Sequence, residues 1–353
     1  MNEEMKKFWE FKTIHSEPVY TLAECIAASP YDTDVDDDDY ENDDYEDISV
    51  DDLTSGIKER FQKAIYLCDE QQLAFLRFAA ELSEKKAAWE TDVAYYPFRV
   101  FCLNDFVYLF ENNGDYYLVL PVELKDIFRE ITNDEGFSNV NGKNLELMFY
   151  ATALLELYGA YEIQHFVVVW NHHHKDKITY KEAETLLSDL AYFESDYYFE
   201  EDYVVHDCLA IDEFDELFDK TYELKYYMPT KSIIRECVTK RHDYDYKIPG
   251  EKEMDDFLAE YIKDERILDD IQLEITYSCV RLESPAEVRE ILADGDLPIG
   301  DADFCGKFER LYNILRENTR IWELRGFTPY QYQIETGKTI PRFKLPKEKE
   351  RKN

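Results

Sequence analysis

The stretch from Asn144 to Cys208 reads NLELMFYATALLELYGAYEIQHFVVVWNHHHKDKITYKEAETLLSDLAYFESDYYFEEDYVVHDC, and it contains the signals of one complete folding unit. Apolar residues in Leu145–Tyr158 recur every three or four positions, which predicts an amphipathic helix that ends at Gly159. The apolar residues of Ile163–Trp170 predict a second helix directly after it.

A third helix and a hairpin complete this unit. Thr179 stands at an N-cap position with Glu182 three residues later, as in a capping box, so a helix is expected over about 180–192. Two short aromatic and β-branched runs follow, Tyr197–Phe199 and Tyr203–Val205, and acidic residues separate them. Three helices followed by a two-stranded wing is the order of a winged-helix-like domain.

A similar order precedes this unit. Apolar spacing over 56–89 predicts two helices, and two strand-like runs, Phe106–Phe110 and Tyr116–Leu120, come after them. The runs flank an Asn-Gly dipeptide at Asn113-Gly114, which is a strong hairpin signal. The sequence therefore predicts a degenerate duplication, with tandem winged-helix-like modules.

Helical periodicity dominates the chain beyond Cys208, with Ser284-Pro285 marking one helix start. The expected fold is mainly α with small β-hairpin wings, an α+β class. Five segments are expected: an N-terminal segment (1–55), a first helix-plus-hairpin module (56–135), a central winged-helix-like module (136–210), a helical C-terminal subdomain (211–335) and a basic tail (336–353).

The composition bounds the function. At 353 residues and 45% hydrophobic content the chain can bury a sizeable core. It carries 78 acidic against 40 basic residues, a formal charge of −38, which argues against a general affinity for phosphate backbones or anionic membranes. No run of about 18 apolar residues occurs, and the N-terminus lacks the features of a signal peptide, so a cytoplasmic location without membrane association is expected.

Residues 32–52 form an acidic run with thirteen carboxylates and no basic residue. Repulsion between like charges is expected to keep this run extended and hydrated. One interpretation is a solvated linker. The other is a nucleic-acid mimic or a dock for a basic partner, with interleaved tyrosines as anchors, and its candidate residues are Asp36, Asp37, Asp38, Asp39 and Tyr40.

No catalytic, cofactor-binding or metal-binding residue is predicted. Seven cysteines occur without C-x-x-C spacing, which indicates reduced and mostly buried thiols. The histidines of His172–His174 are consecutive, whereas metal ligands on a helix lie three or four residues apart, so a solvated loop between helices is favoured over a metal site. The usual phosphate-loop, nucleophile-elbow and zinc-protease patterns are absent from the sequence.

The segment Glu317–Pro329 reads ENTRIWELRGFTP. It resembles the N-N-T-R-x-W-x-L-x-G-x-T-P-x-E signature of a group of Firmicutes proteins with Rho-N-terminal-like or winged-helix-like modules, some of which carry a SEC-C segment. Residues 157–159, Leu-Tyr-Gly, are similar to a helix-ending Y-G of that group, and the resemblance covers about residues 60–335. The SEC-C ending is absent and residues 342–349 stand in its place, so no zinc-dependent role is implied, and the group implies no activity.

Arg320, Trp322 and Arg325 are the other candidate interaction residues. Arginines around an indole can recognise a phosphate or carboxylate, with Trp322 stacking on a base. The alternative is that Trp322 fills the core while the two arginines pair with neighbouring acids. Similarly, the basic tail at 342–352 is expected either to contact RNA or to lie on the protein's own acidic surface.

Three functions remain open. The first is a non-enzymatic interaction or regulatory protein that binds a partner with a basic surface. The second is an acidic nucleic-acid mimic that inhibits a DNA- or RNA-binding protein. The third is a nucleic-acid-binding regulator that uses a local basic patch around Arg320, Arg325 and the tail. An enzyme is expected only if a desolvated histidine and a carboxylate meet in a pocket. The partner's identity and the oligomeric state are open.

Overall fold

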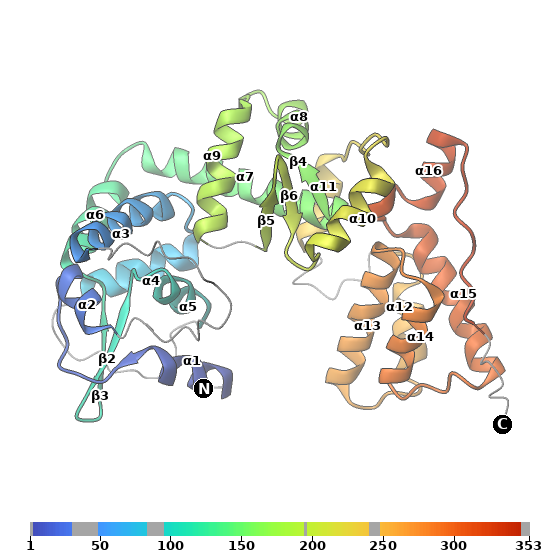
Figure 1. Ribbon diagram of the computed structural model, residues 1–353, viewed down its shortest axis with the longest axis horizontal. Coiled ribbons are helices and arrows are strands. Elements are labelled where there is room, and N and C mark those ends of the chain that lie inside the picture. The colour runs from blue at the N-terminus through green and yellow to red at the C-terminus, as the bar shows by residue number, and fades with distance from the viewer. Residues whose placement is uncertain (1–2, 30–48, 83–94, 194–195, 240–247, 347–353) are drawn as a thin grey trace, which may run out of the picture. The chain divides into compact units, whose positions relative to one another are not determined.

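The computed structural model describes residues 3–29, 49–82, 95–193, 196–239 and 248–346. These residues form sixteen α-helices, one 3₁₀ turn and six short strands (Figure 1), which confirms a mainly α fold with small hairpins. The chain divides into two compact units, 1–148 with 184–195 and 149–183 with 196–353. Their boundaries differ from those of the five segments expected from the sequence, because residues of the expected central module (136–210) fall in both units.

The first unit combines helices with one hairpin. Its elements are α1 (Glu3–Lys12), β1 (Thr13–Ile14), α2 (Leu22–Ala28), α3 (Val50–Ile65), α4 (Glu70–Glu81), α5 (Tyr95–Leu103), β2 (Tyr108–Asn112), β3 (Asp115–Val119), α6 (Val122–Thr132) and the first part of α7 (Phe137–Tyr158). The predicted hairpin is confirmed: β2 and β3 pair antiparallel, and Asn113 and Gly114 both have positive φ, at 56° and 83°. Two such residues make the two-residue turn that matches strand twist.

Aromatic side chains form the core of the first unit. Phe61 of α3 packs edge-on against Phe106 at 5.0 Å between ring centroids, and Phe75 of α4 stacks on Phe101 of α5 at 5.5 Å. All four side chains are buried. Burial of one such ring stabilises the fold by about 1.5–3 kcal/mol, so these contacts explain why α5 is helical although its residues are aromatic and β-branched.

The second unit begins with the end of α7 and contains a three-stranded sheet. Its next elements are β4 (Ala160–Glu162), α8 (Ile163–His173), α9 (Tyr180–Phe193, of which 184–193 belong to the first unit), β5 (Tyr197–Glu200) and β6 (Tyr203–His206). All pairs are antiparallel, in the order β4-β6-β5. The predicted helices and hairpin are present, and the short strand β4 is an addition; the winged-helix class itself stays a prediction.

The two hairpins differ in the third strand that pairs with each of them, and in the first sheet this strand comes from the N-terminal segment. β1 pairs parallel with β2, the first strand of its hairpin, whereas β4 pairs antiparallel with β6, the second strand of its hairpin. The duplication expected from the sequence therefore does not extend to sheet topology.

Helices make up the rest of the second unit. They are α10 (Ile211–Thr221), α11 (Lys231–Thr239), α12 (Glu251–Leu258), α13 (Glu265–Val280), α14 (Pro285–Asp294), α15 (Ala302–Asn318), the 3₁₀ turn η1 (Trp322–Leu324) and α16 (Pro329–Thr336). Ser284 caps α14 in a capping box with Pro285 in the first turn, as predicted. A buried cluster that includes Phe257, Phe304 and Phe308 joins α12–α15.

The start of the basic tail belongs to this helical core. Phe343 and Leu345 are buried, and the Asn313 side chain bonds both the carbonyl and the amide of Phe343, at 3.0 and 2.9 Å. Arg342 lies 3.7 Å from Glu317 in an exposed ion pair. Of the two interpretations of the tail, contact with the protein itself therefore applies to residues 342–346.

The described end of the acidic run is helical. Ser49 caps α3 by accepting the amide of Asp52 at 3.1 Å, and Asp51 and Asp52 occupy the first helical turn, where negative charge is favourable. The expectation of an extended run is therefore wrong for 50–52. Within the described parts of the chain, no helix is both long and apolar enough to cross a membrane.

Candidate functional site

The signature segment after α15 forms a compact double turn. The amide of Ile321 donates to the carbonyl of Phe327 and the amide of Gly326 to the carbonyl of Ile321, at 3.2 and 3.1 Å, and Arg325 and Gly326 both have positive φ. Thr328 then caps α16 in a capping box with Gln331. Gln331 thus occupies the third position of the helix, where a glutamine or glutamate side chain completes a capping box.

Trp322 fixes this segment to the end of α7. The ring is 2% exposed, and its Nε1 donates to the carbonyl of Glu156 at 3.0 Å. It lies directly over Gly159, where an added Cβ would be 2.5 Å from the ring. Gly326 approaches Tyr158 in the same way, since a Cβ there would lie 2.6 Å from the tyrosine ring. Tyr158-Gly159 at the end of α7 and the segment Trp322–Gly326 therefore pack directly against each other.

Both candidate arginines are engaged within the fold. Arg325 is 3% exposed, its Nε donates to the carbonyl of Thr221 at 3.2 Å, and its guanidinium lies 4.1 Å from the Tyr226 ring centre. Arg320 donates to the carbonyl of Gly326 at 2.8 Å and lies 4.1 Å from the ring centre of Tyr227. Charged groups held by such contacts are poorly placed to bind a large external ligand.

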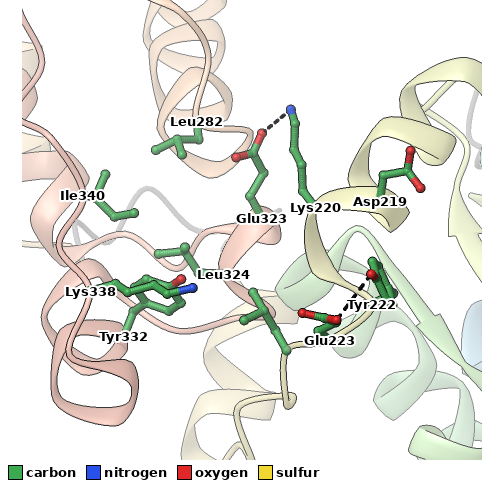
Figure 2. Close-up of a pocket in the computed structure, with 11 residues that line it drawn as sticks. Asp219, Lys220, Tyr222, Glu223, Leu282, Glu323, Leu324, Tyr332, Lys338 and Ile340 are labelled. Atoms are coloured by element: carbon green, nitrogen blue, oxygen red, sulfur yellow. Dashed lines mark hydrogen bonds and ion pairs between the residues drawn. The ribbon is translucent and has the colours of Figure 1, made fainter.

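Two neighbours in the same segment do face a solvent-accessible pocket. Glu323 and Leu324 line a pocket of about 260 Å³ together with residues from four other segments (Figure 2). The complete lining is Asp219, Lys220, Tyr222, Glu223, Leu224, Leu282, Glu323, Leu324, Tyr332, Lys338 and Ile340.

The pocket combines an apolar floor with a charged rim. Leu324 and Tyr332 are buried and belong to one hydrophobic cluster, against which Leu224, Leu282 and Ile340 pack. On the rim, Lys220 Nζ lies 2.8 Å from Glu323 Oε1, and this hydrogen bond raises the pKa of Lys220. The eleven lining residues include no histidine, cysteine or serine.

The helix α10 places an acidic surface beside this pocket. Its sequence, IDEFDELFDKT, contains five carboxylates and one lysine, Lys220. Carboxylates of α10 and of the β5–β6 wing both lie near Tyr198 of β5. The pKa of Tyr198 is raised mainly by burial and further by the negative charges of Glu200, Glu213, Asp215 and Asp212. The wing and α10 thus share one acidic field.

A histidine and two carboxylates do meet in the second unit, outside this pocket. His206 is 4% exposed; its Nδ1 lies 2.9 Å from Asp207 Oδ1 and its Nε2 lies 3.8 Å from Glu156 Oε1. Burial opposes the charged form, but interactions with the side chains of Cys208 and Glu156 outweigh it and raise the pKa of His206 to about 10. A group that stays an imidazolium at neutral pH serves as an ion-pair partner and is a poor general base.

The histidines of α8 and its C-cap have structural contacts. His165 stacks on Tyr226 at 3.9 Å, and burial lowers its pKa to about 4, so it is neutral. His172 and His173 extend α8, and His174 stacks on Trp170 at 3.8 Å, so the expected loop begins later than predicted. Among the described residues, no three His, Cys, Asp or Glu side chains are grouped so that they could hold a metal ion.

The candidate residues of the acidic run, Asp36 to Asp39 and Tyr40, lie outside the described residues. The pocket and the α10 surface were not predicted from the sequence. The apolar residues at 211–222 recur at the three- and four-residue spacing of an ordinary amphipathic helix, so the sequence gives no signal that part of this face is exposed.

No protein-family model matches the chain. Searches of curated proteins and of solved structures also find no match. The resemblance to the Firmicutes group stays a prediction.

Proposed function

We propose that the chain is a non-enzymatic cytoplasmic protein that binds a basic protein partner through the acidic surface of α10 and the β5–β6 wing. The observation that carries this proposal is the negative charge of α10, which has five carboxylates and one basic residue, Lys220. Lys220 is already paired with Glu323 at 2.8 Å. The surface therefore attracts basic partners and accelerates their encounter.

Two observations argue against nucleic acid as the partner. In helix-turn-helix and related domains the recognition helix enters the major groove, yet α9, which has that place in the order of elements, carries Lys181 against Glu182, Glu184 and Asp189. The wing turn adds three further acids at 200–202. Phosphate backbones are repelled by such a surface.

The nucleic-acid mimic receives no separate support. That hypothesis depended on the acidic run at 32–52, of which residues 32–48 lie outside the described residues. The described acidic surface is interrupted by aromatic side chains, which favour contact with a protein.

The proposal is tested with a disordered lysine-rich peptide as the basic probe, measured by fluorescence anisotropy at low and at physiological salt. The variant Asp215→Asn/Glu216→Gln/Asp219→Asn should weaken binding. A matched control, Asp270→Asn/Glu274→Gln/Asp294→Asn, removes the same charge from exposed positions of α13 and α14. Equal loss in both variants would show that only the overall charge matters and would contradict the proposal, as would tight binding of duplex DNA.

A further inference from the structure

The helix α10 has an exposed apolar stripe in addition to its buried face. Phe214, Leu217 and Thr221 face the protein interior. On the solvent side, Ile211 is 62% and Tyr222, which follows the helix, is 59% exposed, and Phe218 lies between them at 38%. These three residues are seven and four positions apart, which places them on one side of the helix over about 16 Å.

The stripe is held in place by the sheet below it. Phe218 stacks on Tyr222 at 5.9 Å and meets Tyr203 of β6 edge-on at 5.7 Å. Such anchored aromatic groups lose little conformational entropy when they bind a partner. The stripe is therefore a preformed surface.

The stripe runs directly into the pocket. Tyr222 belongs to both, and Asp219, Lys220 and Glu223 of the same helix end line the pocket (Figure 2). At about 260 Å³ the pocket is smaller than the roughly 300–1,000 Å³ of small-molecule sites, so it suits one inserted apolar side chain. The stripe and the pocket together are called the α10 docking surface.

Charge complementarity defines what fits the α10 docking surface. Carboxylates border the stripe at Asp212, Asp215, Glu216 and Asp219, so the ligand needs basic residues beside its apolar line. An apolar line over three helical turns with basic flanks is the pattern of an amphipathic basic helix. A flexible basic chain would satisfy the carboxylates but leave the stripe in water.

We infer that the α10 docking surface binds an amphipathic basic helix of a partner protein, with the apolar face of that helix on Ile211, Phe218 and Tyr222 and one large apolar side chain in the pocket. This inference rests on the proposed function, because it specifies the basic partner proposed there. On this inference the apolar stripe provides most of the binding affinity, and the carboxylates raise the rate at which the partner associates.

The test uses two synthetic peptides of the same leucine and lysine composition. One places leucines at helical i, i+3, i+4 and i+7 spacing, and the other is a scrambled sequence that cannot form an apolar face. Binding to the full chain is compared with that to Ile211→Ser/Tyr222→Ser. The control variant, Ile267→Ser/Tyr192→Ser, removes the same residue types from exposed positions on α13 and α9.

The amphipathic peptide should bind more tightly than the scrambled one, and the α10 variant should weaken it about tenfold or more while the control does not. Equal binding of both peptides, or no effect of the α10 variant, would overturn the inference and leave the proposed function standing. If neither peptide responds to the loss of the α10 carboxylates in Asp215→Asn/Glu216→Gln/Asp219→Asn, both fail.

Discussion

At the scale of single residues, the contact of Trp322 with Gly159 explains two short motifs that are far apart in the sequence. The indole covers the glycine that ends α7 and donates to the carbonyl of Glu156, three residues before it. No other residue than glycine fits beneath the ring, because φ at Gly159 is +70° and any Cβ would lie 2.5 Å from it. The ring in turn closes the core beside β4 and β6.

Gly159→Ala should lower the free energy of unfolding by about 2–4 kcal/mol, from backbone strain and overpacking together. Gly337→Ala is the matched control, since Gly337 has a φ of +71° but open space around it, and it should lose only the strain component of about 1 kcal/mol. Urea unfolding of both full-length variants measures the difference. Equal losses would show that the contact with Trp322 is unimportant.

His206 should make stability depend on pH in a defined direction. Its pKa is raised in the folded chain from 6.5 to about 10, so the folded state binds the proton more tightly than the unfolded state does. The stabilisation is complete below pH 6.5 and is lost as pH rises toward 10.

In His206→Gln this dependence should disappear. The difference in unfolding free energy between the native chain and the variant, measured by urea denaturation from pH 6 to pH 10, should shrink steadily as the pH rises. A difference that stays constant with pH would mean that the imidazolium and Glu156 do not interact, and that the variant only removes packing.

The sequence indicates the importance of Arg320, Trp322 and Arg325 but not which atoms reach solvent. Rare residue types in a short motif identify the segment. The alternative interpretation placed Trp322 in the core, where it is buried, but it paired the two arginines with acids, whereas they contact backbone carbonyls and tyrosine rings. Whether the arginines reach solvent depends on their contacts with Thr221, Tyr226 and Tyr227. These residues are about one hundred positions away in the sequence, so only the tertiary structure shows that they are close. The pocket could not be predicted for the same reason, since its lining comes from five separate segments.

At the scale of elements, α16 shows how a local signal determines a helix start. Thr328, Pro329 and Gln331 supply the cap, the first-turn proline and the reciprocal capping-box bond. Arg320 donates to the Gln331 side chain at 3.2 Å, so a cation already lies beside this helix terminus. The element is therefore suited to a carboxylate at position 331.

Gln331→Glu should stabilise the chain by about 0.5–1 kcal/mol, because a carboxylate is favourable in the first helical turn and beside Arg320. Gln333→Glu adds the same charge at an exposed position of the same helix and should change stability by less than about 0.5 kcal/mol. Thermal unfolding of the two variants distinguishes them. Destabilisation by Gln331→Glu would contradict the assigned role of this residue.

Helices with strong periodicity and caps were predictable, and short or tertiary-dependent elements were not. Spacing and capping signals predict α8 and α9 to within three residues of their observed ends, and they predict the end of α7 and the start of α14. The predicted start of α7 was wrong, because the helix begins at Phe137 and not at Leu145. The three residues of β4 carry no pattern of their own and pair with β6 across more than forty positions. The helix α5 has strand-favouring residues and depends on contacts such as Phe75 with Phe101.

At the scale of the whole molecule, the formal charge of −38 affects stability as well as recognition. Self-repulsion destabilises compact states and is screened by salt. The melting temperature should therefore rise as sodium chloride is increased from low to physiological concentration. A melting temperature that is flat or falls would show that ion pairs such as Lys220 with Glu323 outweigh the repulsion.

The same charge makes non-specific attraction of any polycation unavoidable, so affinity alone cannot identify the binding surface. The α10 docking surface is distinguished by location, since it alone is proposed to combine an apolar stripe, a pocket and bordering carboxylates. Binding at this surface should bury the amides of α10 and of the residues that line the pocket. Non-specific attraction should distribute protection over many acidic elements.

The most direct test of the α10 docking surface is hydrogen–deuterium exchange of the full chain with and without the amphipathic leucine–lysine peptide. Binding at the α10 docking surface should slow exchange mainly in Ile211–Leu224 and in Glu323–Leu324. Protection spread over other acidic helices such as α13, or confined to them, would contradict the claim that the partner binds on α10.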